Sequence, residues 1–254
     1  MAINLNSPYK SVQKIILEWL TCSGLLLTAL STANACELPQ WQADYKVTKY
    51  NTTIARVNMS LKTGEKSAEY RLHSKAVGLL AAFSDEELTE TSELKQADDK
   101  SWQLIKFSQL RAKDKQREQQ FAVQQTDDGL IAEGTAETKP FKLNLSAPVW
   151  DRSSVQLAIT CDLLAADKPQ PAYDYNIVDN GQMTTYHFDY RGPDNIRIAD
   201  KQFDTYTFER ISGDRSTKFW LAPTLQYMPV RMEQYKKGKL HLRMTLDLPA
   251  SEKS

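Results

Sequence analysis

Residues 175–190, YNIVDNGQMTTYHFDY, give the strongest local indication of the fold. Asn180 and Gly181 lie in the middle of this stretch, and both residue types tolerate the positive φ angles of a type I′ turn. The residues on either side of the pair are typical of strands. The stretch therefore predicts a β-hairpin with a two-residue turn.

Period-two alternation extends from this hairpin over most of the chain. Residues 41–50, 54–61 and 67–75 alternate and are joined by short polar linkers, which is the pattern of antiparallel hairpins. Further strand candidates are residues 86–94, 102–111, 115–126, 203–211, 228–237 and 240–248. About a dozen strands do not stay flat in one open sheet; they curl or split into a sandwich.

One segment departs from this alternation and predicts a helix. Val155, Ile159 and Leu163 lie at helical spacing, and Asp151 or Ser153 can cap the start of the helix. No internal repeat or low-complexity linker divides the chain. The fold class that we predict is mainly β: a curled antiparallel sheet, half-barrel or barrel-like, with one helix closing it.

Charge and hydropathy exclude two classes of protein. The 254-residue chain carries 32 basic and 32 acidic side chains, and no basic stripe indicates a nucleic-acid partner. No uncharged apolar run reaches about 18 residues, so we expect no ordinary membrane span after signal cleavage. The sequence identifies no protein partner.

The N-terminus has the features of an export signal. Lys10 and Lys14 form a basic region, residues 20–31 are largely apolar, and small residues lead to a cleavage site after Ala35. The uncleaved alternative is an N-terminal membrane anchor. We favour cleavage because Glu18 interrupts the apolar run.

Cleavage at this site divides the chain into a signal peptide (residues 1–35) and a single mainly-β periplasmic domain (residues 36–254). Cys36 directly after the site raises a third possibility, a lipoprotein anchored at that cysteine. A lipobox normally has leucine three places before the cysteine, where this chain has Ala33. Lipoprotein anchoring is therefore the minor alternative.

The mature chain keeps two cysteines, Cys36 and Cys161, because Cys22 leaves with the signal. Two cysteines in an oxidising compartment fit a single disulfide, and two separate thiols are the alternative. A bridge that closes so long a loop contributes at most about 4–5 kcal/mol in the loop-entropy model. A cysteine nucleophile is less favoured, since no histidine is near either residue in sequence.

Candidate catalytic and metal-binding groups each have a simpler structural interpretation. The three histidines, His73, His187 and His241, lie singly in strand candidates, without a second ligand at metal spacing. The chain has neither a Gly-x-Ser-x-Gly elbow nor a glycine-rich phosphate loop. We therefore expect a non-enzymatic protein with no metal and no cofactor.

Aromatic residues are concentrated in or beside the predicted strands, with five tryptophans and eleven tyrosines in the chain. A curled sheet with an aromatic inner face forms either a filled core or an apolar ligand cavity. Trp102, Phe107, Tyr206 and Phe208 are typical of such a lining, and we take them as the candidate ligand-binding residues.

Residues 218–239, KFWLAPTLQYMPVRMEQYKKGK, resemble the C-terminal signature of an uncharacterised exported bacterial family, domain-of-unknown-function family 3108. The matching residues are Trp220, Leu221, Ala222, Pro223, Tyr227, Pro229, Val230 and Arg231. Residues 41–62 resemble the opening hairpin of the family. Asp151 and Ser154 resemble its Asp-x-x-Ser helix start, whereas Cys161 has no counterpart that we can assign. The resemblance covers most of residues 38–248.

The resemblance implies a fold but no activity. The Trp-Leu-x-Pro … Pro-Val-Arg link is also similar to one in periplasmic lipoprotein-carrier families, which form an incomplete β-barrel closed by helices over an apolar cavity. In this interpretation Pro223 and Pro229 bracket a short link between two strands. Trp220 anchors the first strand in the core, and Arg231 faces away from Val230.

Three functions follow, and the first is preferred. It is a non-enzymatic periplasmic envelope protein that binds a lipid or another apolar or amphipathic ligand within the curled sheet. The second is a structural or interaction module of the envelope with a filled core and an exposed strand edge. The third is a glycan-active enzyme, which requires two carboxylates that face one cleft. A cavity above about 300 Å³ distinguishes the first function from the second.

Overall fold

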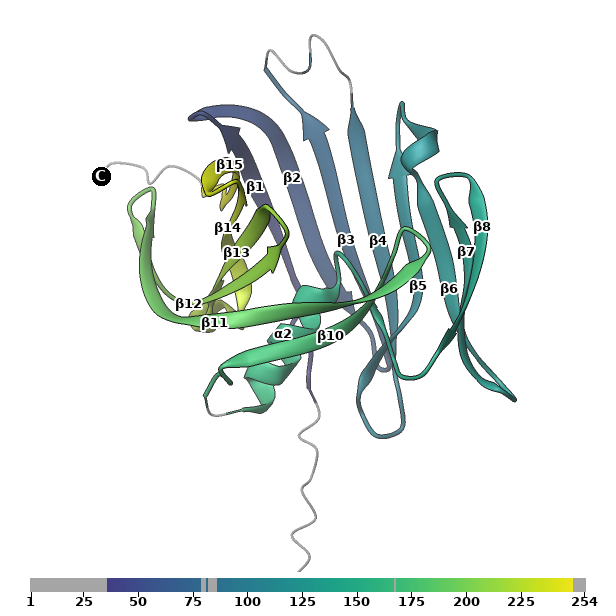
Figure 1. The fold of residues 1–254 in the computed structure, drawn as a ribbon. Coiled ribbons are helices and arrows are strands. Elements are labelled where there is room, and N and C mark those ends of the chain that lie inside the picture. Colours follow the sequence, from purple (N-terminus) through teal and green to yellow (C-terminus); the bar gives the residue numbers. More distant parts are fainter. Residues whose placement is uncertain (1–35, 79–80, 82–85, 167, 249–254) are drawn as a thin grey trace, which may run out of the picture. The chain divides into compact units, whose positions relative to one another are not determined.

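The structure, a computed structural model, describes residues 36–248 except 79–80, 82–85 and 167 (Figure 1). This part of the chain contains fifteen β-strands, the helix α2 (Val155–Ala165) and two short 3-10 turns, η1 (Lys115–Arg117) and η2 (Pro223–Leu225). The predicted signal peptide over residues 1–35 lies outside the described residues.

The strands have the following bounds: β1 (Trp41–Lys49), β2 (Thr52–Thr63), β3 (Ser67–Ala76), β4 (Glu87–Gln96), β5 (Trp102–Arg111), β6 (Gln119–Thr126), β7 (Gly129–Ala136), β8 (Lys139–Leu145), β9 (Trp150–Asp151), β10 (Ala172–Asp179), β11 (Gln182–Ile198), β12 (Lys201–Ser212), β13 (Arg215–Ala222), β14 (Met228–Lys236) and β15 (Lys239–Leu246).

All fifteen strands belong to one sheet, in the order β8-β7-β6-β5-β4-β3-β2-β1-β15-β14-β13-β12-β11-β10-β9. Neighbours pair antiparallel, except β9, which pairs parallel with β10. The strands β8 and β9 end this order, so the described ladder is not a closed ring. The prediction of a mainly-β, antiparallel fold with one helix is confirmed at this level.

The hairpin predicted at Asn180 and Gly181 forms between β10 and β11. Asp179 pairs with Gln182, and the two turn residues have φ angles of 50° and 70°. Both angles lie in the left-handed region that a type I′ turn requires. The local sequence therefore sets the register of this hairpin, as expected.

The helix α2 is buried on more than one side. Val155, Ile159 and Leu163 pack with Phe208 of β12 in one group of buried side chains. Leu157 packs in a second group, which includes Trp220, Tyr45 and many other side chains. Because apolar residues surround it, the helix is a core element and not an amphipathic surface helix.

A third group of buried side chains joins two distant parts of the sheet order. It contains Phe107 of β5 and Phe121 of β6, together with Val178 of β10. The neighbouring turn makes a similar contact, since a Cβ atom added at Gly181 would lie 3.1 Å from the ring of Phe141 on β8. The β10–β11 hairpin therefore packs against strands β5 to β8.

A disulfide bond joins Cys36 to Cys161, with their Cα atoms 5.1 Å apart. It connects the segment before β1 to the helix α2. The indole nitrogen of Trp102 donates a hydrogen bond of 2.9 Å to the carbonyl oxygen of Cys36. The predicted disulfide is therefore present, and the segment before β1 is fixed to the core at this point.

Candidate functional site

A cavity of about 440 Å³ lies against one face of the sheet and next to the start of α2. Its lining comes from strands β2, β3, β4 and β10 to β14, from the turn that precedes the helix and from the first residues of α2. The apolar part of the lining consists of Met59, Leu72, Val155, Phe188, Phe219 and Met232.

Strand pairing explains why these apolar side chains meet. Met59 on β2 is directly opposite Leu72 on β3, and Phe219 on β13 is directly opposite Met232 on β14. Directly paired residues point to the same face of an antiparallel sheet, so each pair forms one patch of the cavity wall. The same alternation that predicts the strands therefore also builds the apolar wall.

A row of polar side chains extends this face across three further strands. Glu90 on β4 is opposite Gln109 on β5, which is opposite Gln119 on β6. The three residues are only 5%, 2% and 1% exposed. Gln109 Nε2 donates to Glu90 Oε1 at 2.9 Å, and Gln119 Nε2 donates to Asp179 Oδ1 at 2.9 Å. These buried polar groups therefore satisfy one another, as burial requires.

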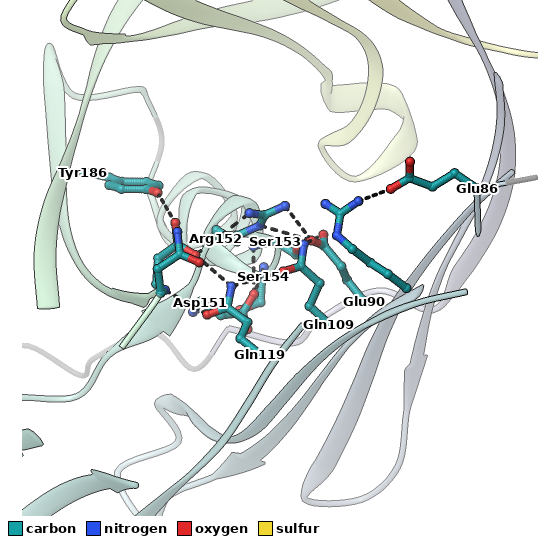
Figure 2. Close-up of polar contacts among 12 residues, drawn as sticks. Glu86, Glu90, Gln109, Gln119, Asp151, Arg152, Ser153, Ser154 and Tyr186 are labelled. Atoms are coloured by element: carbon teal, nitrogen blue, oxygen red, sulfur yellow. Dashed lines mark hydrogen bonds and ion pairs between the residues drawn. The ribbon is translucent and has the colours of Figure 1, made fainter. Parts of the chain in front are cut away.

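Arg152 neutralises the acidic end of this row (Figure 2). Its Nη2 atom lies 2.8 Å from Glu90 Oε1, and its Nη1 atom lies 4.0 Å from Asp179 Oδ1. Burial lowers the pKa of the Arg152 guanidinium, but the charges of Glu90 and Asp179 outweigh burial and raise it. Ser153 Oγ also donates a hydrogen bond to Glu90. The cluster thus places paired charged groups in the cavity wall, close to the apolar side chains of Leu72 and Val155.

The Asp-x-x-Ser motif shapes the turn that carries Arg152. Asp151 is fully buried, and its Oδ1 atom accepts the backbone N–H groups of Ser153 at 2.8 Å and Ser154 at 2.9 Å. Ser154 Oγ donates to Asp151 Oδ2 at 2.6 Å. Burial raises the pKa of the Asp151 carboxyl, and these hydrogen bonds oppose that rise. Asp151 and Ser154 therefore fix the turn before α2 through local side-chain to backbone hydrogen bonds.

The two serines have no contact typical of a nucleophile. Within the described part of the chain, Ser153 and Ser154 form hydrogen bonds with carboxylates and backbone groups, and neither bonds to a histidine. A serine nucleophile requires a general base within hydrogen-bond reach. The prediction that Asp151 or Ser153 caps the helix is wrong, because the N-cap residue is Ser154 and its side chain makes no capping hydrogen bond. The two serines instead form bonds that hold the turn before α2 together.

The aromatic residues expected to line a ligand site lie in different places. Trp102 packs in the group that includes Leu61, and Phe107 packs with Phe121. Tyr206 and Phe208 pack around α2. None of the four lines the 440 Å³ cavity, and Trp102 lines a separate recess of about 500 Å³ beside Cys36.

The buried polar row is a feature that the sequence reasoning missed. In β4, Glu90 and Leu94 are an even number of residues apart, so both side chains point to the same, inward face, and both are buried. A carboxylate in phase with the apolar positions of a strand is the signal that reveals such a residue. The pattern does not show what neutralises it, because Arg152 lies far away in sequence.

Trp220 of the C-terminal signature is buried, as expected for a core anchor. It is 7% exposed, and its indole nitrogen donates to Asp194 Oδ2 at 2.8 Å. The Arg231 guanidinium lies over the indole ring at 5.9 Å. Arg231 therefore contacts Trp220, whereas its neighbour Met232 lines the cavity.

The link between β13 and β14 has the form that the two prolines predict. Pro223 starts the 3-10 turn η2, and Pro229 lies at the second position of β14. Between them, Gln226 and Tyr227 adopt left-handed backbone angles, with φ of 52° and 62°. Tyr45 Oη donates a hydrogen bond of 2.8 Å to the Pro229 carbonyl oxygen, which holds the link against β1.

The described residues contain neither a metal-ligand cluster nor a helix that could span a membrane. In residues 36–248, apart from the gaps stated above, no group of three or more His, Cys, Asp and Glu side chains is placed to hold a metal ion. No helix in this part of the chain has the length and apolarity to cross a membrane.

His187 is exposed and lies 2.8 Å from Asp174 and 3.2 Å from Asp189, and hydrogen bonds to these two carboxylates raise the pKa of its imidazole.

The comparisons with known proteins identify a family and a fold. The family model described as "Protein of unknown function (DUF3108)" matches residues 42–247, so the chain belongs to the DUF3108 family, as the C-terminal signature predicted. Among curated proteins, no relative matches the chain. A crystal structure of a beta-barrel-like protein of domain of unknown function DUF1849 from Brucella abortus is similar, with a TM-score of 0.55. Its identity is 11%, over 84% of this chain and 98% of that chain, so this likeness concerns the fold alone.

Proposed function

We propose that this DUF3108 protein is a non-enzymatic envelope protein of the periplasm that binds an amphipathic ligand, such as a lipid or an acyl chain. The cavity beside α2 carries the proposal. Its volume of about 440 Å³ falls in the range of about 300–1,000 Å³ that is usual for ligand sites. A protein whose core is simply filled does not need such a space.

The two kinds of wall argue for an amphipathic ligand. Met59, Leu72 and Met232 offer apolar surface, which favours a hydrocarbon chain. Glu90 and Arg152 place a paired charge in the same lining, where an uncharged hydrocarbon gains nothing. A ligand with one apolar part and one polar part matches both walls.

We also propose that the sheet curls into an incomplete barrel around this cavity, closed on one side by α2. The contacts of the β10–β11 hairpin support this arrangement, because Asp179 on β10 accepts a hydrogen bond from Gln119 on β6. Val178 packs beside Phe107 and Phe121 in the same region. The beta-barrel-like description of the similar DUF1849 protein agrees with it.

Export to the periplasm is supported by the N-terminal signal pattern and by the disulfide between Cys36 and Cys161. Disulfides persist in oxidising compartments such as the periplasm. The bridge uses the sulfur atom of Cys36 that a thioether-linked lipid would need. Lipid anchoring at Cys36 and this disulfide therefore exclude each other.

The first alternative is a structural or interaction module that pairs through a free strand edge. Among the described strands, β8 pairs with β7 alone and so presents such an edge. Lys139, Pro140 and Lys142 lie on this short strand, and lysine and proline discourage edge-to-edge pairing. This observation makes the edge a weaker basis for function than the cavity.

The second alternative, a glycan-active enzyme, has one supporting observation. Glu90 and Asp179 both line the cavity, and a pair of carboxylates is what such an enzyme uses. However, Glu90 accepts hydrogen bonds from Gln109, Arg152 and Ser153. These contacts already occupy the Glu90 carboxylate, which favours a structural role for it over a catalytic one. We therefore place ligand binding first.

Filling the cavity tests the proposal. Met232→Trp adds bulk at the cavity wall, and Met183→Trp makes the same change at an exposed position that does not line the cavity. The delipidated protein is titrated with fatty acids and phospholipids, and binding is followed by calorimetry and thermal shift. We expect binding by the parent protein and by Met183→Trp, with affinity at least about tenfold weaker in Met232→Trp, equivalent to about 1.4 kcal/mol.

Two results would contradict the proposal. One is the absence of binding and of thermal stabilisation in the parent protein for every lipid tested. The other is equal affinity in Met232→Trp and Met183→Trp, which would place the ligand elsewhere. Leu72→Trp fills the cavity from a different strand and serves as a second variant if Met232→Trp fails to fold.

A further inference from the structure

A second, smaller recess of about 190 Å³ adjoins the cavity. The two share four lining residues, Arg210, Arg215, Thr217 and Gln234, which lie on β12, β13 and β14. A ligand in the cavity can therefore extend into the recess without crossing the sheet.

The recess has a distinct chemical character. Its remaining lining residues are Ser212, Ser216, Tyr235, Lys236 and His241. Two arginines, one lysine and one histidine thus line a space that also presents hydroxyl and amide groups, and the lining contains no acidic residue. Arginine and hydroxyl groups are the donors that proteins use for phosphate and carboxylate groups.

The two arginines of the recess lack the pairing that Arg152 has. Among the residues that the structure describes, neither Arg210 nor Arg215 has a carboxylate within 4.0 Å, whereas Arg152 lies within that distance of both Glu90 and Asp179. Charge pairing is therefore complete at one end of the cavity and incomplete at the other.

Arg210 is also held in place. It is half-buried, and its guanidinium carbon lies 3.5 Å from the centre of the Tyr186 ring. A guanidinium group held against a ring face can still form two parallel hydrogen bonds to an oxyanion through its edge. A half-buried cation without an anionic partner is costly, and a bound anion offsets that cost.

The carboxylate that accepts a hydrogen bond from the lining residue Tyr235 is already engaged by another cation. Glu233 accepts a hydrogen bond from Tyr235 and lies 2.6 Å from Arg243 Nε. It is 4% exposed and does not line the recess. Its charge is therefore offset by Arg243 and does not cancel that of Arg210 and Arg215.

From these observations we infer that the recess is an anion-binding subsite, and that the amphipathic ligand carries a phosphate-type anionic headgroup there while its chain lies in the cavity. The inference rests on the proposed function for the placement of the chain. Binding of the anion requires only the recess, so the anion subsite and the proposed function can be tested separately.

Four probes distinguish the sources of the anion. Dodecyl phosphate has an anionic head, dodecylphosphocholine a zwitterionic head and dodecyl maltoside a neutral head, and all three carry the same chain. Inorganic phosphate has the anion without the chain. Each is titrated by calorimetry below its micelle concentration, at low and at high salt. We expect the parent protein to bind dodecyl phosphate at least about tenfold more tightly than dodecyl maltoside at low salt, and less selectively at high salt.

The variant Arg210→Gln/Arg215→Gln removes both charges and keeps polar side chains of similar length. We expect it to lose the preference for dodecyl phosphate, so that dodecyl phosphate and dodecyl maltoside bind it with similar affinity. Arg197→Gln is the matched control, since Arg197 is an exposed arginine of β11 that lines neither space. It should keep the full preference.

The outcomes separate the two ideas. Equal affinity for all three amphiphiles, or an unchanged preference in the double variant, overturns the anion subsite and leaves the proposed function standing. Binding of inorganic phosphate that the double variant loses, without binding of any amphiphile, supports the subsite and overturns the proposed function. The absence of binding by every probe overturns both. Matching unfolding midpoints of parent and variants show that the comparison concerns folded protein.

Discussion

The buried ion pair between Arg152 and Glu90 permits a quantitative prediction. Arg152→Met removes the guanidinium and leaves the Glu90 carboxylate, which is 5% exposed, with the hydrogen bonds from Gln109 and Ser153. Removal of one partner of a buried pair usually costs about 3–5 kcal/mol. Because the Arg152 side chain is 33% exposed and two donors remain, we expect a smaller loss of unfolding free energy, about 2–3 kcal/mol.

A double-mutant cycle tests the physical reason for this loss. Glu90→Gln keeps a hydrogen-bonding side chain but removes the charge, and we expect it to cost about 1–2 kcal/mol. In Glu90→Gln/Arg152→Met no charge of this pair is left unpaired. The double variant should therefore lose about 1–2 kcal/mol less than the sum of the two single variants.

Urea unfolding, followed by tryptophan fluorescence, measures these free energies, provided that the slope with denaturant stays constant. Lys106→Met is the control, because Lys106 forms an exposed pair with Glu93 across β4 and β5. It should change stability by no more than about 0.5 kcal/mol. Additivity of Glu90→Gln and Arg152→Met within about 0.3–0.5 kcal/mol would refute the reasoning.

Two further predictions concern stability. Trp220→Ala should cost about 3–5 kcal/mol in urea unfolding, as for other buried aromatics, and a loss below about 1 kcal/mol would contradict its place in the core. The second prediction concerns stability in acid and depends on Asp247. Burial acts to raise the pKa of the Asp247 carboxyl, but hydrogen bonds and charges from Lys46 and Arg56 outweigh burial and lower this pKa below the ordinary 3.8. A lowered pKa in the folded state stabilises the protein above the ordinary value, and this stabilisation is lost as the pH falls through the folded-state pKa. Asp247→Asn should therefore reduce unfolding free energy at neutral pH and reduce it less below about pH 4, and an equal difference at all pH values would contradict this linkage.

Local patterns predicted the elements of this fold well. Asn180 and Gly181 fixed one hairpin, because few residue pairs accept two positive φ angles. Val155 and Leu163 indicated the helix, although α2 starts only after the turn that Asp151 shapes. The strand β9 has two residues, which is too short for any alternation to be recognised.

The candidate site was less predictable, because it depends on which elements cover each face. Phe208 has the alternation of an inward-facing strand residue, but α2 and its neighbours cover it, so it belongs to the packed core. Glu90 has the same inward parity on β4, yet it lies on the cavity wall. The alternation along a strand shows which side chains share a face of the sheet. Only the long-range arrangement of strands and helix determines whether that face is covered by other side chains or borders a cavity.

The sheet order has a consequence for how the site comes into existence. The first described strand, β1, pairs with the last, β15, whereas every other pairing in the described sheet joins strands that follow each other in the chain. Closing this contact brings together residues at opposite ends of the domain, at the loop-closure cost that so long a separation carries. Met59 and Met232 lie on opposite sides of that pairing, so the cavity has both of its walls only after the last strand has joined the first. The cavity is thus completed by the slowest class of contact to form, and a chain without its last strand would expose the apolar walls to water.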